Sequence, residues 1–147
     1  MRAFAQGRYG ESTAAARRAL AADERALGEA SPQVGADLVL LGASLRGEGH
    51  PELAEHVLRR ALAVYERGGV TGARRAFARM NLALTLVDTG AFERALPMAR
   101  EAIASLGPSA AGSERAQALA VLGEVLTRAG ELGPAGEALE AAWVAAR

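Results

Sequence analysis

The sequence predicts an all-α protein made of repeated helix pairs, and two observations lead to this class. Alanine accounts for about a quarter of the 147 residues, leucine is the next most common residue, and Ile103 is the only isoleucine. Helices favour alanine and leucine, whereas strands favour β-branched residues. The second observation is an internal repeat of about 40 residues, which indicates a helical array. Each copy carries a glycine at the same place: Gly7, Gly49, Gly90 and Gly130.

The copies share residue types at fixed distances from this glycine. Leucines precede it by eight and by four positions, a small residue follows it by five, and an alanine follows it by twelve. The small residues are Ser12, Ala54, Ala95 and Ala135, and the alanines are Ala19, Ala61, Ala102 and Ala142. The alignment predicts one domain over residues 1–147, with a leading half unit at 1–30 and full units at 31–70, 71–108 and 109–147.

Each full unit predicts two helices joined by a tight turn. In the first helix, Leu38, Leu41 and Leu45 fall on one face, which must be buried. A glycine just past this stripe can adopt the left-handed conformation that ends a helix. The residue after the first leucine of each pair is small, which allows the two helices to cross closely. These small residues are Gly42, Ala83 and Gly123.

The elements follow in order along the chain. The half unit predicts a turn at Gly7 and then one helix of the second type. Residues that suit an N-cap or a first turn mark later helix starts: Ser31-Pro32, Pro51, Thr71 and Ser113. The last helix follows Gly130, which makes about seven helices.

Two residues depart from the repeat pattern. Arg79 lies where the stripe requires a buried leucine, so either its helix is rotated or its side chain extends to water. Pro97 lies inside a second helix, where it removes a hydrogen bond and should bend the helix locally.

With these residues the chain resembles the tetratricopeptide repeat family, and the longer period is similar to the variety found in kinesin light chains and bacterial regulators. Residues 27–34 are similar to that variety's linker, and the runs 81–83 and 95–97 are similar to its helix pair. HEAT and armadillo repeats share the period but lack this spacing, and they rank second. The resemblance implies a right-handed α-α superhelix whose first helices line a concave surface that binds a peptide or protein.

Composition disfavours other classes of function. Seventeen basic and 17 acidic residues balance, which argues against nucleic acid and anionic membranes as partners. No run is apolar enough to span a bilayer, and the absence of cysteine fits a reducing compartment, so we expect a cytoplasmic protein. His50 and His56 are six residues apart with no further metal ligand between them. We expect no metal, no cofactor and no catalytic residues, and therefore no enzyme.

The expected groove residues are those that the buried stripe leaves free on the first helices. Phe77, Met80 and Leu84 would seat an apolar anchor, or would instead belong to the core. Asn81 corresponds to an asparagine that contacts the ligand in similar long-repeat proteins, but Leu40 and Val121 replace it in the other units. The full set is Val39, Arg46, Phe77, Met80, Asn81, Leu84, Asp88, Gln117, Glu124 and Arg128.

The final helix is expected to leave an apolar strip uncovered. Leu132, Leu139 and Trp143 form this strip, and solenoids need capped ends. Either the chain is a piece of a longer protein, or the strip pairs with a second copy in a homodimer. The alternative is that Trp143 packs back onto its own repeat.

The sequence therefore predicts a scaffold that binds a peptide or protein segment in the concave groove and possesses a surface for self-association. A second interpretation is a ligand-sensing domain of a bacterial transcriptional or signalling regulator.

Overall fold

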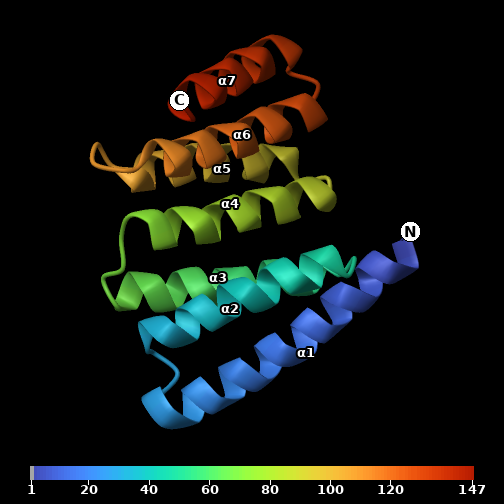
Figure 1. Ribbon diagram of the computed structural model, residues 1–147, viewed down its shortest axis with the longest axis vertical. Coiled ribbons are helices and arrows are strands. Elements are labelled where there is room, and N and C mark those ends of the chain that lie inside the picture. Colours follow the sequence, from blue (N-terminus) through green and yellow to red (C-terminus); the bar gives the residue numbers. More distant parts are fainter. Residues whose placement is uncertain (1) are drawn as a thin grey trace. The chain divides into compact units, whose positions relative to one another are not determined.

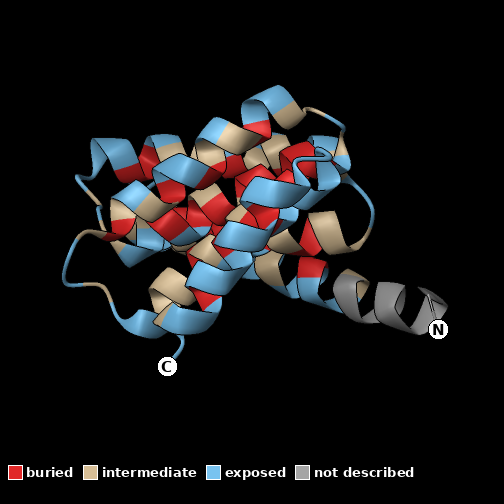
Figure 2. Cartoon of the chain, turned by 90° about the horizontal axis from the view of Figure 1, so that it is seen from above, coloured by how far each residue is buried: buried red, intermediate tan, exposed pale blue. Residues whose placement is uncertain are grey.

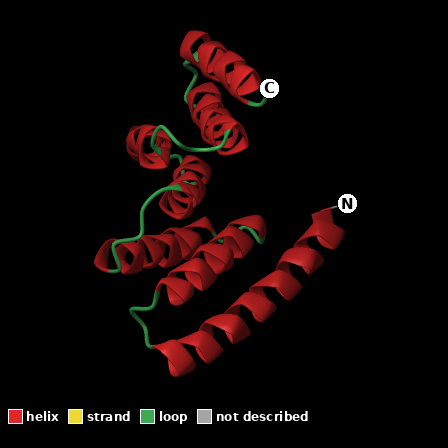
Figure 3. Ribbon diagram, turned by 60° about the vertical axis from the view of Figure 1, so that its left-hand side comes forward, coloured by secondary structure: helices red, strands yellow, loops and turns green. Residues whose placement is uncertain are grey.

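The computed structural model describes the backbone of residues 2–147 and the side chains of residues 10–147. Within residues 2–147 there are seven helices and no strands, which confirms the all-α prediction (Figures 1 and 3). The helices are α1 (Arg2–Leu27), α2 (Pro32–Gly47), α3 (Pro51–Arg67), α4 (Ala73–Asp88), α5 (Phe92–Leu106), α6 (Gly112–Arg128) and α7 (Leu132–Ala145).

The chain divides into two compact units, Met1–Val70 and Thr71–Arg147. The division coincides with the predicted boundary between the repeats at 31–70 and 71–108. In unit 1, α2 contacts both α1 and α3. In unit 2, α4 contacts α5 and α6, and α6 also contacts α5 and α7. Buried residues lie on the sides of helices that are turned toward neighbouring helices (Figure 2).

Three of the four repeat glycines form the predicted turns. Gly49, Gly90 and Gly130 have φ angles of 89°, 79° and 85°, and each follows the end of a first helix. At Gly49 the amide of His50 donates to the carbonyl of Leu45 at 2.9 Å, and the amide of Gly49 donates to the carbonyl of Arg46 at 3.0 Å. This pair of bonds is a Schellman motif, which satisfies the last carbonyls of α2.

The predicted turn at Gly7 is wrong, because α1 is continuous from Arg2 to Leu27. Glycine within a helix costs only about 1 kcal/mol relative to alanine, and helix-favouring residues such as Ala3 and Ala5 precede it. Residues 2–27 therefore form one long helix with no turn at Gly7.

The small residues beside the leucine stripe are a packing requirement, as predicted. A Cβ atom added to Gly42 would lie 2.5 Å from Cγ of Leu58, and one added to Gly123 would lie 2.6 Å from a methyl carbon of Leu139. In the middle repeat the equivalent residues are Ala83 and Ala99, both fully buried. At the crossing of the two helices, a glycine in the first helix is thus paired with a leucine in the second helix, and an alanine in the first helix is paired with an alanine in the second.

Helix starts follow the predictions in the first full unit and differ in the other two. Ser31 Oγ accepts from the amide of Gln33 at 3.3 Å, and Pro51 is the first residue of α3. Thr71 does not cap α4, which begins after Gly72. Ser113 lies inside α6, where Glu114 instead accepts from the amide of Ala111 at 3.2 Å. The glutamate therefore satisfies the amide of the N-cap residue, whereas an N-cap serine hydroxyl would accept from an amide inside the first turn.

Arg79 shows how an arginine occupies a stripe position. Its guanidinium donates to the hydroxyl of Ser105 and, at 3.5 Å, to the carbonyl of Glu101 on α5. The side chain therefore reaches α5 and keeps its charge partly exposed to water, one of the two predicted outcomes. Pro97 is exposed within α5, and the local bend expected there stays a prediction.

Candidate functional site

Two residues expected to line a groove are instead part of the core. Val39 and Met80 are only 3% and 4% exposed, so neither offers a side chain to a ligand. The reason is that a first helix contacts more than its own partner, as α4 contacts both α5 and α6. Its buried stripe is therefore wider than the leucine pattern indicates. Arg46 is half-buried on α2.

The remaining expected residues on α4 share one face. Phe77 is 39% exposed, Leu84 is half-buried and Asp88 is exposed. Asn81 is half-buried, and its amide Nδ2 donates to the carbonyl of Phe77 at 3.0 Å within the same helix. This face presents two apolar side chains with a polar group between them.

The expected residues of α6 are all exposed, and α6 contacts α4 in the same unit. Gln117, Glu124 and Arg128 occupy the repeat positions of Phe77, Leu84 and Asp88, so they extend the same surface with polar groups. We call these six residues and Asn81 the α4/α6 face. It combines two apolar side chains on α4 with polar and charged side chains on both helices.

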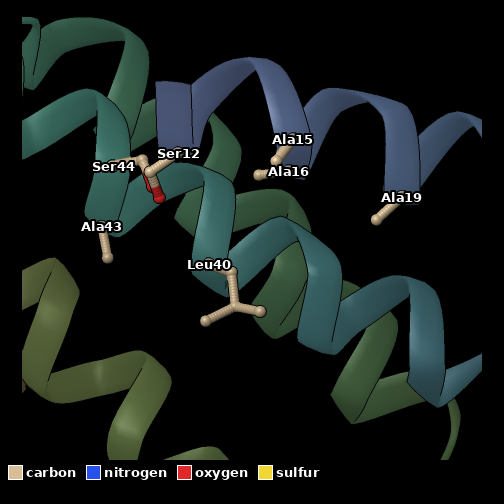
Figure 4. A pocket seen from close by; sticks show the side chains of 7 residues that line it. All are labelled: Ser12, Ala15, Ala16, Ala19, Leu40, Ala43 and Ser44. Atoms are coloured by element: carbon tan, nitrogen blue, oxygen red, sulfur yellow. The ribbon is translucent and has the colours of Figure 1, made fainter. Parts of the chain in front are cut away.

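A second surface lies in unit 1, between α1 and α2, and the sequence analysis did not assign α1 to any site. It is a groove of about 470 Å³ with almost entirely apolar walls. We call it the α1/α2 groove; its lining residues are Ser12, Ala15, Ala16, Ala19, Leu40, Ala43 and Ser44 (Figure 4). Ser12 and Ser44 share a hydrogen bond of 2.9 Å between their hydroxyls. The signal for this groove in the sequence was the set of small residues on one face of α1, Ser12, Ala15, Ala16 and Ala19.

Two carboxyl groups lie on the same helix faces as the groove residues, one on α1 and one on α2. Asp23 is four residues after Ala19, and Asp37 is three residues before Leu40. Asp37 is 5% exposed, and its Oδ2 atom is buried without a hydrogen-bond partner. The pKa of Asp37 is raised from 3.8 to about 6, mainly by burial, and both a hydrogen bond with Asp23 and the charge of Asp23 contribute to the rise.

The apolar strip on α7 is exposed. Leu132, Trp143 and Leu139 are 70%, 65% and 47% exposed, and Val144 extends the strip at 60%. The guanidinium of Arg147 lies 5.7 Å from the centre of the Trp143 ring. Trp143 therefore does not pack back into its own repeat, although Leu139 does cover Gly123.

Within the described residues, no three His, Cys, Asp or Glu side chains are grouped closely enough to hold a metal ion. None of the helices within residues 2–147 is both long and apolar enough to cross a bilayer.

Comparison with known proteins identifies the class of repeat. Two family models, both described as tetratricopeptide repeat, match residues 3–67 and 78–106. Together they cover more than half of the chain, which belongs to the tetratricopeptide repeat family. Repeats of this family generally mediate protein–protein interaction, and their fold is generally a non-catalytic scaffold. No curated protein matches the sequence.

Solved structures share the fold. The crystal structure of BtubC (BKLC) from P. vanneervenii matches with a TM-score of 0.80 and 22% identity, over 95% of this chain and 57% of that one. The chain thus spans little more than half the length of that relative. A Podosopora anserina putative kinesin light chain with nearly identical TPR-like repeats, and a variant of it with one substitution, both give TM-scores of 0.44, at 14% and 15% identity. Each of these covers 95% of this chain and 87% of the other. The strongest of these likenesses supports the tetratricopeptide solenoid fold predicted from the sequence.

Proposed function

We propose that this chain is a non-catalytic scaffold whose two units form one domain and whose α4/α6 face binds a peptide or protein segment. The observation that carries the proposal is the partly exposed apolar pair on α4, Phe77 and Leu84, bordered by charged residues of α6. Apolar anchors with a polar rim are the usual arrangement of a binding hot spot. The balance of acidic and basic residues supports a protein partner over nucleic acid.

The test replaces the apolar pair with charge. The double variant Phe77→Asp/Leu84→Asp should bind its partner at least tenfold more weakly, because both anchors would carry a desolvation cost. The partner is first identified by crosslinking in the native host, and binding of the purified partner is then titrated by calorimetry. The control is Ala104→Asp, which lies on an exposed part of α5. Equal affinity for the double variant and the wild type would refute the site, provided that circular dichroism shows both folded.

We further propose that the chain self-associates through α7. Trp143 and Leu132 are large apolar side chains with more than half of their surface exposed. Two copies of one helix face can close a two-fold dimer without leaving a free surface. Light scattering of the wild type should show a dimer that Trp143→Gln converts to a monomer. A wild type that is monomeric at sub-millimolar concentration would refute this surface.

A further inference from the structure

The contact of α1 with α2 has two carboxyl groups where the equivalent contact in unit 2 has only apolar side chains. The equivalent contact is that of α5 with α6. There, Leu106 of α5 and Ala118 of α6 are 6% and 0% exposed. At the same distances from the repeat glycines, α1 has Asp23 and α2 has Asp37. We call these two residues the Asp23–Asp37 pair.

The carboxyl of Asp37 is buried without enough partners for a charge. The residue is 5% exposed, and its Oδ2 atom has no hydrogen-bond partner. Its side chain hydrogen-bonds with Asp23 and with Gln33 of its own helix. A hydrogen bond between two carboxyl groups needs one proton, because two ionised carboxylates offer only acceptors. The hydrogen bond within the pair therefore exists only while one of the two carboxyl groups is protonated.

The charged groups of the surrounding helices are engaged elsewhere. On α1, Glu24 pairs with Arg60 of α3 at 2.8 Å, and Arg25 is exposed and donates to a carbonyl of its own helix at 3.2 Å. On α2, Arg46 is nine residues beyond Asp37, which is more than two helical turns. The group that favours the ionised form of Asp37 is the uncharged side chain of Gln33.

The direction of the proton effect follows from the pKa of Asp37. Burial is the main reason why this pKa is raised from 3.8 to about 6, and the hydrogen bond and the charge of Asp23 add to the rise. The packed arrangement thus binds the proton more tightly than a separated carboxyl does. The contact is therefore strongest at low pH and weakens as the pH rises from 3.8 to about 6.

The face of α1 that carries Asp23 also covers apolar residues of α2. Ala16 and Leu20 of α1 pack against the cluster that contains Leu41 and Leu45, which are 3% and 2% exposed. Three residues before Ala16 on the same face, Thr13 is buried, and its hydroxyl has no hydrogen-bond partner. The contact thus has an apolar centre with an unsatisfied polar atom on each side of it. Such a contact opens more readily than a fully apolar one.

We infer that the Asp23–Asp37 pair is a pH-sensitive switch: α1 is held on α2 while the two carboxyl groups share a proton, and it opens from α2 when both are ionised. Opening uncovers Leu41 and Leu45, while α2 and α3 stay packed on each other. Acid strengthens this contact, whereas acid usually weakens a folded protein by protonating paired carboxylates. The switch lies within unit 1 and is independent of the α4/α6 face.

Hydrogen–deuterium exchange of the whole protein tests the switch, because it reports the opening of each helix separately. The exchange is read by mass spectrometry at pH 5 and at pH 8 and is corrected for the intrinsic exchange rate. In the wild type, protection of amides in residues 17–27 should be about tenfold lower at pH 8 than at pH 5, the ratio that follows from a pKa of about 6 when packed and 3.8 when open. Protection of α3 and α6 should not change.

Three variants show whether the pair is responsible. Asp23→Leu/Asp37→Ala supplies the residue types of the α5–α6 contact, so α1 should be equally protected at both pH values and at least as well as in the wild type at pH 5. Asp37→Ala alone removes the buried carboxyl and should also abolish the pH effect, which covers the case that the double variant does not fold. Glu11→Gln removes an exposed carboxylate from the same helix and should keep the tenfold effect.

Three results would overturn the inference. One is equal protection of α1 at pH 5 and pH 8 in the wild type. Another is a pH effect that persists in Asp37→Ala. The third is a loss of protection at pH 8 that is as large in α2 and α3 as in α1, which would mean that unit 1 opens as a whole and that α1 has no separate motion. None of these results bears on the α4/α6 face, because its variants lie in the other unit.

Discussion

The replacement of Asp37 by alanine should make the protein more stable, and the gain should depend on pH. Asp37 is 5% exposed, and its pKa is raised from 3.8 to about 6, mainly by burial, with the hydrogen bond to Asp23 and the charge of Asp23 contributing. The other repeats show that alanine fits this position, because the equivalent Ala78 and Ala118 are fully buried.

The sign of this pH dependence follows from the protonation state of the Asp37 carboxyl in the folded and unfolded chains. Above pH 6 the carboxyl is ionised in both the folded and the unfolded chain, and the folded chain bears the full cost of burying the charge. Below pH 3.8 it is protonated in both states and the cost disappears. A rise of about two pKa units corresponds to about 3 kcal/mol, since one unit is worth about 1.4 kcal/mol. Asp37→Ala should therefore raise the free energy of unfolding by about 3 kcal/mol at pH 8, or the melting temperature by roughly 6–12 °C.

The assay is urea unfolding followed by circular dichroism at pH 8 and at pH 3.5, with the wild type and Asp37→Ala measured side by side. Glu66→Gln, which removes an exposed carboxylate from α3 in the same unit, is the control and should change little at either pH. A stabilisation of the same size at both pH values would show that packing and not ionisation is responsible. No stabilisation at pH 8 would refute the claim that Asp37 is a buried charge that the fold tolerates at a cost.

Two further predictions concern the repeat glycines. Gly42→Ala should destabilise the protein by about 1–3 kcal/mol in urea unfolding, because the new methyl would meet the buried Leu58 side chain at 2.5 Å. Adding Leu58→Ala to this variant should recover part of the lost stability, because the double variant has the alanine pair that Ala83 and Ala99 form in the next repeat. If the free-energy changes of the two single variants simply add up in the double variant, the steric explanation is wrong. Gly90→Ala should cost about 1–2 kcal/mol, because its φ of 79° is unfavourable for alanine while no atom lies within 4 Å of the added methyl. An unchanged melting temperature for Gly90→Ala would show that the turn relaxes without strain.

Much of the fold was predictable because the relevant interactions are local and recur. The left-handed turns at Gly49, Gly90 and Gly130 depend on a residue type and on the helix directly before it. The pairing of Gly42 with Leu58 depends on two residues in one repeat. The turn expected at Gly7 failed because a glycine alone does not end a helix.

The candidate sites were less predictable because exposure depends on distant neighbours. The pattern on one helix does not reveal that Met80 is buried or that Leu40 is open to solvent, since each depends on which helices lie beside it. The raised pKa of Asp37 likewise comes mainly from burial in the packed structure, and Asp23, fourteen residues earlier, adds to it because the packing of α1 on α2 brings the two carboxyl groups together.

The sequence by itself determined the helices, most of their turns and the spacing of small and large residues at each crossing, because these follow from backbone conformation and from side chains close together in the chain. Only the tertiary structure decided which equivalent residues are covered. Ala19 and Ala102 have the same place in the repeat, yet one is exposed and the other buried, because burial is a property of the surroundings and not of the residue.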